Sequence, residues 1–252
     1  MSWERELEFA ARVAAEAGGH ALALQKGITA DEKPDHSPVT RADKECERMI
    51  ARAIEETFPA DGVLGEEGAS SESRSGRRWI IDPIDGTRDF LRGNPLWGPM
   101  IALEENGEVV VGHVRFPALG TSYWASRGGG AFGDGERLHV SSKTVAEESM
   151  LCINQFSKLD PARYSGRILE WLSRFWAVRG LGGTPDAMMV ASGQAEMWVE
   201  PSASPWDFAA PKIVVEEAGG LFRNFDGGSS IYAGNGVALT PGLIGELAFF
   251  LK

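Results

Sequence analysis

The sequence is poor in the residues that build disulfide frameworks and zinc clusters. Its 252 residues include two cysteines, Cys46 and Cys152, which lie far apart and in unrelated contexts. A framework or cluster needs several cysteines or histidines at short, regular spacing, and the four histidines are scattered as well. The two thiols are therefore predicted to be buried and free.

Positive charge is also scarce. There are 25 Lys and Arg residues against 36 Asp and Glu, which gives a formal net charge of -11 at pH 7. Nucleic acids and anionic membranes bind basic patches, so neither is expected as the main partner. If the substrate is an anion, a bound cation must reverse the local charge.

Long apolar runs and several catalytic motifs are missing. No run approaches the roughly 20 residues of a membrane-spanning helix, and the N-terminal sequence MSWERELEFAARVAAEAGG lacks the apolar core of a signal peptide. There is no Gly-x-Ser-x-Gly elbow and no Walker loop. A cytoplasmic protein is expected, and neither serine-hydrolase nor P-loop chemistry is indicated.

The first half of the chain is predicted to combine helices with antiparallel strands. Residues 3–25 have the spacing of an amphipathic helix, and a second helix is expected to begin near Thr40, whose hydroxyl suits the N-cap position. Alternating apolar runs on both sides of Asn106 and Gly107 predict a β-hairpin.

Near residue 146 the pattern changes to alternating strands and helices, including one helix over residues 161–175. We therefore predict an N-terminal α+β subdomain, residues 1–145, and a C-terminal α/β subdomain, residues 146–252.

The stretch WIIDPIDGTRDF, residues 79–90, places Asp82 and Asp85 in a turn after a short apolar strand. Neighbouring carboxylates repel each other unless a cation or a shared proton offsets the repulsion. A calcium loop that starts at Asp82 does not fit, because Ile84 stands at its third position, which must carry an oxygen ligand. A phosphatase with an aspartate nucleophile and a plain turn both remain as alternatives.

Two further motifs also place acidic residues at the end of a predicted element. Glu66 and Glu67 end another apolar run, in VLGEEG, and Asp207 lies in the first turn of a helix that follows Pro205. Each feature alone is commonly a surface pair or a helix-dipole partner. Together, carboxylates at three strand or helix ends, without clustered histidines, indicate hard divalent cations bound by oxygen.

The motifs GEE, WIIDPIDGT and WD, the last followed by a helix ending EEAGG, resemble the signature set of the inositol monophosphatase family of magnesium-dependent, lithium-sensitive phosphatases. The resemblance runs from SPVTRAD to EEAGG and is closest to the histidinol-phosphatase branch. It implies an α+β fold, a layered α/β/α/β/α sandwich of the sugar-phosphatase type. It also implies a homodimer.

The resemblance further implies a metal site and a reaction. Glu66, Asp82, Asp85, Asp207 and the backbone carbonyl of Ile84 would hold two or three Mg²⁺ ions per site. A metal-activated water would then hydrolyse a phosphate monoester.

Three more residues would assist the reaction. Gly86 and Thr87 would offer backbone N–H groups to the phosphate. Glu66 and Thr87 would orient the water, and Asp43 would hold Thr87 as a proton acceptor. On sequence alone, Asp43 fits equally well as a first-turn residue of a helix capped by Thr40.

The resemblance places Glu200 against the organic part of a small phosphorylated metabolite. Gly182 and Gly183 stand where similar histidinol phosphatases carry Gly-Asp, and Asp186 is a candidate to replace the missing charge. The substrate-binding set is predicted to be Ile84, Asp85, Gly86, Thr87, Gly182, Gly183, Glu200 and Asp207.

Three functional hypotheses follow. The first is hydrolysis of histidinol phosphate, with an inositol 1-phosphate or another small polyol or sugar phosphate as the alternative substrate. The second is a non-catalytic dimer that uses the same fold to bind a protein. The third is the aspartyl-phosphate phosphatase, with Asp82 as nucleophile.

Overall fold

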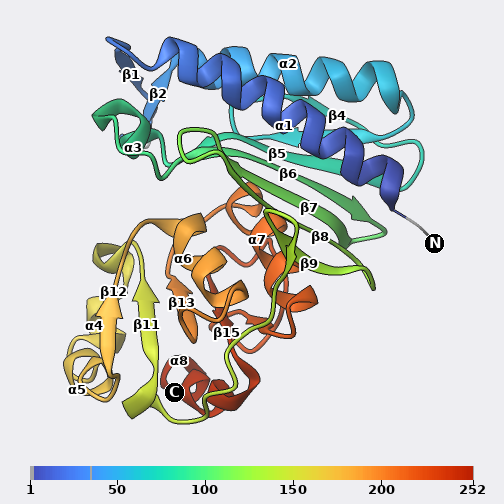
Figure 1. Ribbon diagram of the computed structural model, residues 1–252. Coiled ribbons are helices and arrows are strands. Elements are labelled where there is room, and N and C mark those ends of the chain that lie inside the picture. Colours follow the sequence, from blue (N-terminus) through green and yellow to red (C-terminus); the bar gives the residue numbers. More distant parts are fainter. Residues whose placement is uncertain (1–2, 35, 252) are drawn as a thin grey trace.

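The structure is a computed structural model that describes residues 3–34 and 36–251. Helices α1 (Glu4–Leu24) and α2 (Arg41–Thr57) lie side by side on one face of a large sheet (Figure 1). Both helices lie close to their predicted ranges. The Thr40 side chain accepts the N–H of Ala42 and Asp43, while the Asp43 carboxylate accepts the N–H of Thr40. This reciprocal capping box confirms the predicted start of the second helix.

The large sheet has the strand order β10-β9-β8-β7-β6-β5-β3-β4, and a separate small hairpin joins β1 to β2. The strands are β1 (Ala30–Glu32), β2 (Pro38–Thr40), β3 (Gly62–Gly65), β4 (Ser70–Ser71), β5 (Arg77–Asp85), β6 (Gly98–Glu105), β7 (Glu108–Phe116), β8 (Thr121–Ser126), β9 (Gly130–Gly133) and β10 (Glu136–Arg137). The β6–β7 hairpin turns at Asn106 and Gly107 as predicted.

Strand β5 carries the aspartate motif to the edge of this sheet. Trp79 and Ile81 pack under α1 and α2, while Ile80 packs on the opposite face, so the strand is buried on both sides. Strand β3 runs parallel to β5. Parallel strands end at the same edge, so Glu66, just after β3, comes close to Asp82 and Asp85.

The second half forms a smaller sheet in the order β12-β11-β13-β15-β14. Its strands are β11 (Met150–Ile153), β12 (Ala177–Arg179), β13 (Met197–Glu200), β14 (Leu221–Arg223) and β15 (Gly236–Leu239). Its helices are η1 (Ala146–Glu148), η2 (Phe156–Lys158), α4 (Pro161–Tyr164), α5 (Ile168–Leu172), α6 (Gly183–Ala191), α7 (Pro205–Glu217), η3 (Pro241–Leu247) and α8 (Ala248–Leu251).

The prediction of a single helix over residues 161–175 is wrong, because α4 and α5 are separate. Arg167, between them, has φ -130° and is not helical. The break lets two aromatic rings share one partner: the Tyr164 ring lies 5.6 Å from that of Phe249, and the Trp171 ring lies 4.6 Å from it. Tertiary packing thus outweighs the local helical pattern.

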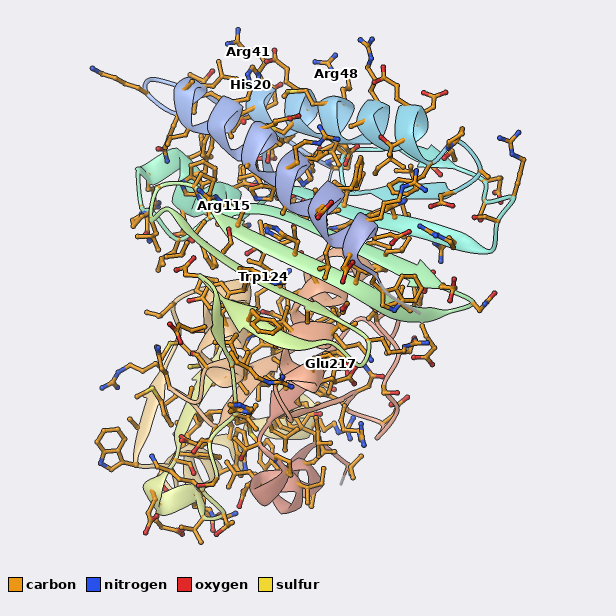
Figure 2. The ribbon with its side chains drawn as sticks, turned by 45° about the vertical axis from the view of Figure 1, so that its right-hand side comes forward. His20, Arg41, Arg48, Arg115, Trp124 and Glu217 are labelled. Atoms are coloured by element: carbon orange, nitrogen blue, oxygen red, sulfur yellow. The ribbon has the colours of Figure 1, made fainter. Side chains whose placement is uncertain are left out.

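Helices α6 and α7 lie between the two sheets (Figure 1). Gly112 of β7 allows α7 to approach closely, since a Cβ there would lie 2.5 Å from Ile213 Cγ2 and 2.9 Å from the Ala210 carbonyl oxygen. At the end of α7, Glu217 accepts the N–H groups of Gly128 and Gly130 at 2.8 and 2.9 Å (Figure 2). The large sheet therefore fixes α7 in the middle and at its end.

The order of layers confirms the expected sandwich. It runs from α1 and α2 through the large sheet, α6 and α7, and the smaller sheet to α4, α5 and α8 (Figure 1). The division into subdomains at residues 145 and 146 stays a prediction. None of the helices in the described residues combines the length and apolar character needed to cross a bilayer.

Candidate active site

Three carboxylates from two distant segments meet between the layers. Asp82 and Asp85 come from the end of β5, and Asp207 comes from the first turn of α7. Each offers an oxygen atom that lies within 4.8 Å of the other two. Asp82 Oδ1 also accepts the N–H of Ile84 at 3.0 Å, which fixes the turn between the two aspartates. The structure therefore brings together three of the four carboxylates predicted to bind metal.

The electrostatics of this cluster call for a cation. Burial raises the pKa of Asp82 well above its usual value, and the charges of Glu66, Asp85 and Asp207 add to the effect. Burial likewise raises the pKa of Asp85 to about 7, although hydrogen bonds from Thr184 favour its charged form. Burial also raises the pKa of Asp207, to about 8. Carboxylate oxygens are the ligands Mg²⁺ prefers, so the donor set fits this ion.

Glu66 lies beside the cluster and is paired with a lysine that our sequence analysis missed. Lys33 Nζ donates to Glu66 Oε1 at 2.8 Å and to Glu67 Oε1 at 2.6 Å. Burial opposes the charge of Lys33, but the two carboxylates raise its pKa. Lys33 lies in the loop after β1, within the conspicuous stretch KPDHSPVTRAD. Nothing in its spacing predicted that it would face two glutamates.

Glu67, for which sequence left a surface role open, is largely enclosed. Its pKa is raised to about 6 by burial, against the hydrogen bond from Lys33. Its backbone N–H donates to Glu47 Oε2 at 2.7 Å. Glu47 therefore fixes the turn that carries both glutamates.

A hydroxyl and a buried carboxylate meet at the side of the cluster. Thr87, the first residue of α3 (Thr87–Arg92), donates through Oγ1 to Asp43 Oδ1 at 3.2 Å and lies 3.3 Å from the Ile84 carbonyl oxygen. Asp43 is fully buried, and burial raises its pKa. Both roles that sequence left open for Asp43, the helix cap and the Thr87 partner, are therefore present.

Glu200 and the two glycines Gly182 and Gly183 border the site on another side of the aspartate cluster. Glu200 is 2% exposed, and its Oε2 accepts from Asn154 Nδ2 at 2.9 Å. A Cβ on Gly183 would lie 3.7 Å from Asp85 Oδ1 and 3.9 Å from Glu200 Oε2. Gly183 thus lies between the aspartate cluster and Glu200. Asn154, after β11, was not predicted.

Asp186 does not replace the missing charge, contrary to the suggestion from sequence. It is fully buried, and its carboxylate accepts the N–H groups of Leu181 and Gly182 at 2.9 and 3.4 Å. These bonds hold the turn that leads into α6. A carboxylate committed to backbone donors inside the protein is not available to a substrate.

Comparison with known proteins agrees with this geometry. The chain matches the inositol monophosphatase family over residues 3–248. It is 42% identical to a histidinol-phosphatase of Chlorobaculum parvum over 248 residues, covering 96% of this chain and 94% of the relative. It is 43% identical to a histidinol-phosphatase of Mycobacterium tuberculosis over 220 residues, covering 85% and 84%.

A solved structure shares the fold. The extragenic suppressor protein suhB from Bartonella henselae superposes with a TM-score of 0.90 at 27% sequence identity, and the match covers 98% of each chain. Fold and site together define a phosphoric monoester hydrolase of the layered sugar-phosphatase type. The chain belongs to the inositol monophosphatase family. That family is metal-dependent and typically uses Mg²⁺, in accord with the acidic cluster.

Proposed function

We propose that this protein hydrolyses histidinol phosphate in a Mg²⁺-dependent reaction. The observation that carries the proposal is the convergence of Asp82, Asp85 and Asp207, with oxygen atoms within 4.8 Å of one another. In the proposal Glu66 and the Ile84 carbonyl complete the ligand set for two or three ions. When bound, Mg²⁺ would polarise the phosphate and lower the pKa of a nearby water, so that the water can lose a proton as it attacks.

The chain's own groups then bind the phosphate and hold a proton. The backbone N–H groups of Gly86 and Thr87 would bind phosphate oxygens, close to the aspartates that follow β5. The Thr87 hydroxyl, held by Asp43 at 3.2 Å, would orient the attacking water together with Glu66. The Asp43 carboxylate is a stronger acceptor than the Ile84 carbonyl. The Thr87 proton would therefore point to Asp43 and leave an oxygen lone pair for the water.

Two observations favour histidinol phosphate as the substrate. The wall around the organic part contains Glu200 with Asn154, and a carboxylate can accept from an ammonium group. The similar proteins from Chlorobaculum parvum and Mycobacterium tuberculosis bear the name histidinol-phosphatase. Inositol 1-phosphate is the second candidate, since a carboxylate also accepts from hydroxyl groups.

The test is phosphate release from L-histidinol phosphate and from inositol 1-phosphate, side by side in Mg²⁺ buffer with an EDTA control. We expect kcat/KM to favour histidinol phosphate by a hundredfold, which is about 2.7 kcal/mol of differential transition-state binding. Preference for inositol 1-phosphate would reject the substrate assignment. Release that EDTA leaves unchanged would reject the metal-dependent reaction.

Two rival hypotheses have separate tests. If Asp82 were a nucleophile, acid-quenched mass spectrometry during turnover would detect an acyl phosphate on it. If the protein were a non-catalytic dimer, Mg²⁺ at millimolar concentration would not bind. We also propose a cytoplasmic homodimer, and light scattering after size-exclusion chromatography tests the oligomeric state.

A further inference from the structure

Asp89 is an acidic residue near the site that the proposed reaction does not use. It lies in α3, two positions after Thr87, and is partly exposed. Its Oδ1 accepts from Asn94 Nδ2 at 2.7 Å, and its carbonyl oxygen accepts the Asn94 N–H at 3.0 Å. Among the described residues, no donor reaches Oδ2. Asn94 thus fixes the carboxylate and leaves one oxygen available.

That free oxygen faces the turn that lines the organic part of the site. A Cβ on Gly182 would lie 3.6 Å from Asp89 Oδ2. Gly182 has φ +117°, a backbone conformation that strongly favours glycine. The absence of a side chain at this position therefore follows from the turn, and it leaves Asp89 Oδ2 open toward the substrate wall.

The neighbouring residue, Gly183, lies beside Glu200. A Cβ on Gly183 would lie 3.9 Å from Glu200 Oε2, so two adjacent glycines border the two carboxylates in turn. The Glu200 Oε1 atom is buried, and it has no hydrogen-bond partner in residues 3–34 and 36–251. A buried carboxylate oxygen without a donor is costly, and a donor supplied by the substrate would remove that cost.

Neither carboxylate is held in an ion pair with a described residue. In the part of the chain that the structure describes, no lysine, arginine or histidine forms an ion pair with Asp89 or Glu200. Burial raises the pKa of Asp89, and the charge of Arg92, in the same helix, opposes that shift; Arg92 is exposed to solvent and forms no ion pair with Asp89. An ammonium group carries three donors and a positive charge, and so matches the two open carboxylate oxygens.

We propose that Asp89 is a specificity-determining residue that, together with Glu200, binds the ammonium group of the substrate. The protein then selects phosphomonoesters of amino alcohols over those of neutral polyols. In this role Asp89 supplies the charge that Gly183 lacks and that Asp186 cannot provide. The inference rests on the proposed function, since it names how the same site recognises its substrate.

The test compares two substrates that differ only in the amine: L-histidinol phosphate and its deamino analogue, 3-(imidazol-4-yl)propyl phosphate. The variant is Asp89→Asn, which keeps Oδ1 for Asn94 and removes the charge. We expect the ratio of the two kcat/KM values to fall roughly tenfold, mainly through KM for the amine. An unchanged ratio would overturn the proposal.

Two controls separate a loss of specificity from a folding defect and from a general effect of removing a charge. A folding defect would lower both rates and leave the ratio unaltered, so a melting temperature accompanies each variant. Asp160→Asn, at the exposed cap of α4, is the matched neutral change and is expected to leave the ratio as in the wild type.

A binding measurement separates this inference from the proposed function. The Kd of L-histidinol, which has no phosphate, is measured by calorimetry in Mg²⁺ buffer for the wild type and Asp89→Asn. We expect roughly tenfold weaker binding in the variant. If wild type binds L-histidinol more tightly than Asp89→Asn does but releases no phosphate from its ester, the proposed function fails and the role of Asp89 in binding the amine stands. An equal Kd in both proteins rejects the inference even if the wild type is an active phosphatase.

Discussion

The Thr87 hydroxyl lies 3.2 Å from Asp43 Oδ1, although the two residues are 44 positions apart in the chain. Asp43 also accepts the Thr40 N–H at 2.8 Å and the Thr40 hydroxyl at 2.6 Å through Oδ2. One carboxylate therefore caps α2 and holds the Thr87 hydroxyl beside the aspartate cluster. The start of a helix and the geometry of the site are fixed by the same side chain.

The first prediction concerns this shared carboxylate. In Asp43→Asn the amide must present either its NH₂ or its oxygen to Thr87. If the oxygen stays with the Thr40 N–H, the NH₂ faces Thr87 and removes its proton acceptor. We expect kcat to fall by about 10² to 10³ with little change in KM, measured by steady-state phosphate release.

Thr40→Ala provides the control for this prediction. It removes the capping hydroxyl, with an expected loss of about 1 kcal/mol of stability, and leaves the contact between Asp43 and Thr87 in place. If Thr40→Ala lowered kcat as much as Asp43→Asn, the effect would come from the helix cap and not from the Thr87 contact.

The second prediction concerns metal dependence. At pH 8 the metal-free protein should be more stable as Asp85→Asn than as wild type, because a neutral amide replaces a carboxylate whose charge burial opposes. The sign follows from the raised pKa of Asp85, about 7: the cost of its charge appears as pH rises from its usual value through 7. Adding Mg²⁺ at a hundred times its Kd should raise the wild-type free energy of unfolding by about 2.7 kcal/mol, and the melting temperature with it.

In Asp85→Asn that response to Mg²⁺ should be small and phosphate release nearly abolished. Calorimetric melting with and without Mg²⁺ measures the first, and a phosphate assay the second. Asp160→Asn should behave as wild type in both. An Asp85→Asn variant that kept most of its activity would remove this residue from the metal site.

The third prediction concerns the approach of α7 to the sheet. In Gly112→Ala the new methyl would meet Ile213 and the Ala210 carbonyl at 2.5 and 2.9 Å, so the helix must shift. We expect a loss of about 1 to 3 kcal/mol in the free energy of unfolding. Because Asp207 begins the same helix, Mg²⁺ affinity should weaken too, as calorimetric titration would show.

Gly19→Ala is the matched control for Gly112→Ala. Gly19 lies inside α1, and a Cβ there meets nothing within 4 Å. Alanine is the better helix former, so this variant should be more stable by up to about 1 kcal/mol. If Gly112→Ala kept normal Mg²⁺ affinity despite losing stability, the link between helix position and Asp207 would be wrong.

The fourth prediction concerns pH. His113 is buried beneath Trp124, its ring 6.5 Å from the indole, and its Nδ1 has no hydrogen-bond partner among the described residues. Burial lowers the pKa of His113 to about 4, with a smaller contribution from Arg115. Between pH 6.5 and pH 4 the unfolded chain binds a proton there and the folded chain does not. Stability should therefore fall as pH falls through this window.

His113→Phe removes this titration and keeps a ring against Trp124. Denaturant unfolding at pH 7 and pH 4 should show the wild type losing about 3 kcal/mol more than the variant. Carboxylates elsewhere titrate in both proteins, so the difference isolates His113. Equal losses would mean that the histidine is protonated in the folded protein.

The sequence by itself determined the elements with a local cause. The capping box at Thr40 and Asp43 sets the start of α2, and the turn at Asn106 and Gly107 sets the central hairpin. The cap and the turn depend on neighbours in the chain. The family resemblance of the acidic motifs also anticipated that Asp82, Asp85 and Asp207 meet, although Asp207 comes from a helix in another layer.

Only the tertiary structure decided which side chains meet across the layers. Lys33 against Glu66, Asn154 against Glu200, and Asp89 against Gly182 join segments far apart in sequence. The same holds for Asp186, whose carboxylate could face either the site or its own turn, and for the break between α4 and α5. These outcomes depend on how whole layers pack, and local spacing carries no information about the distance between them.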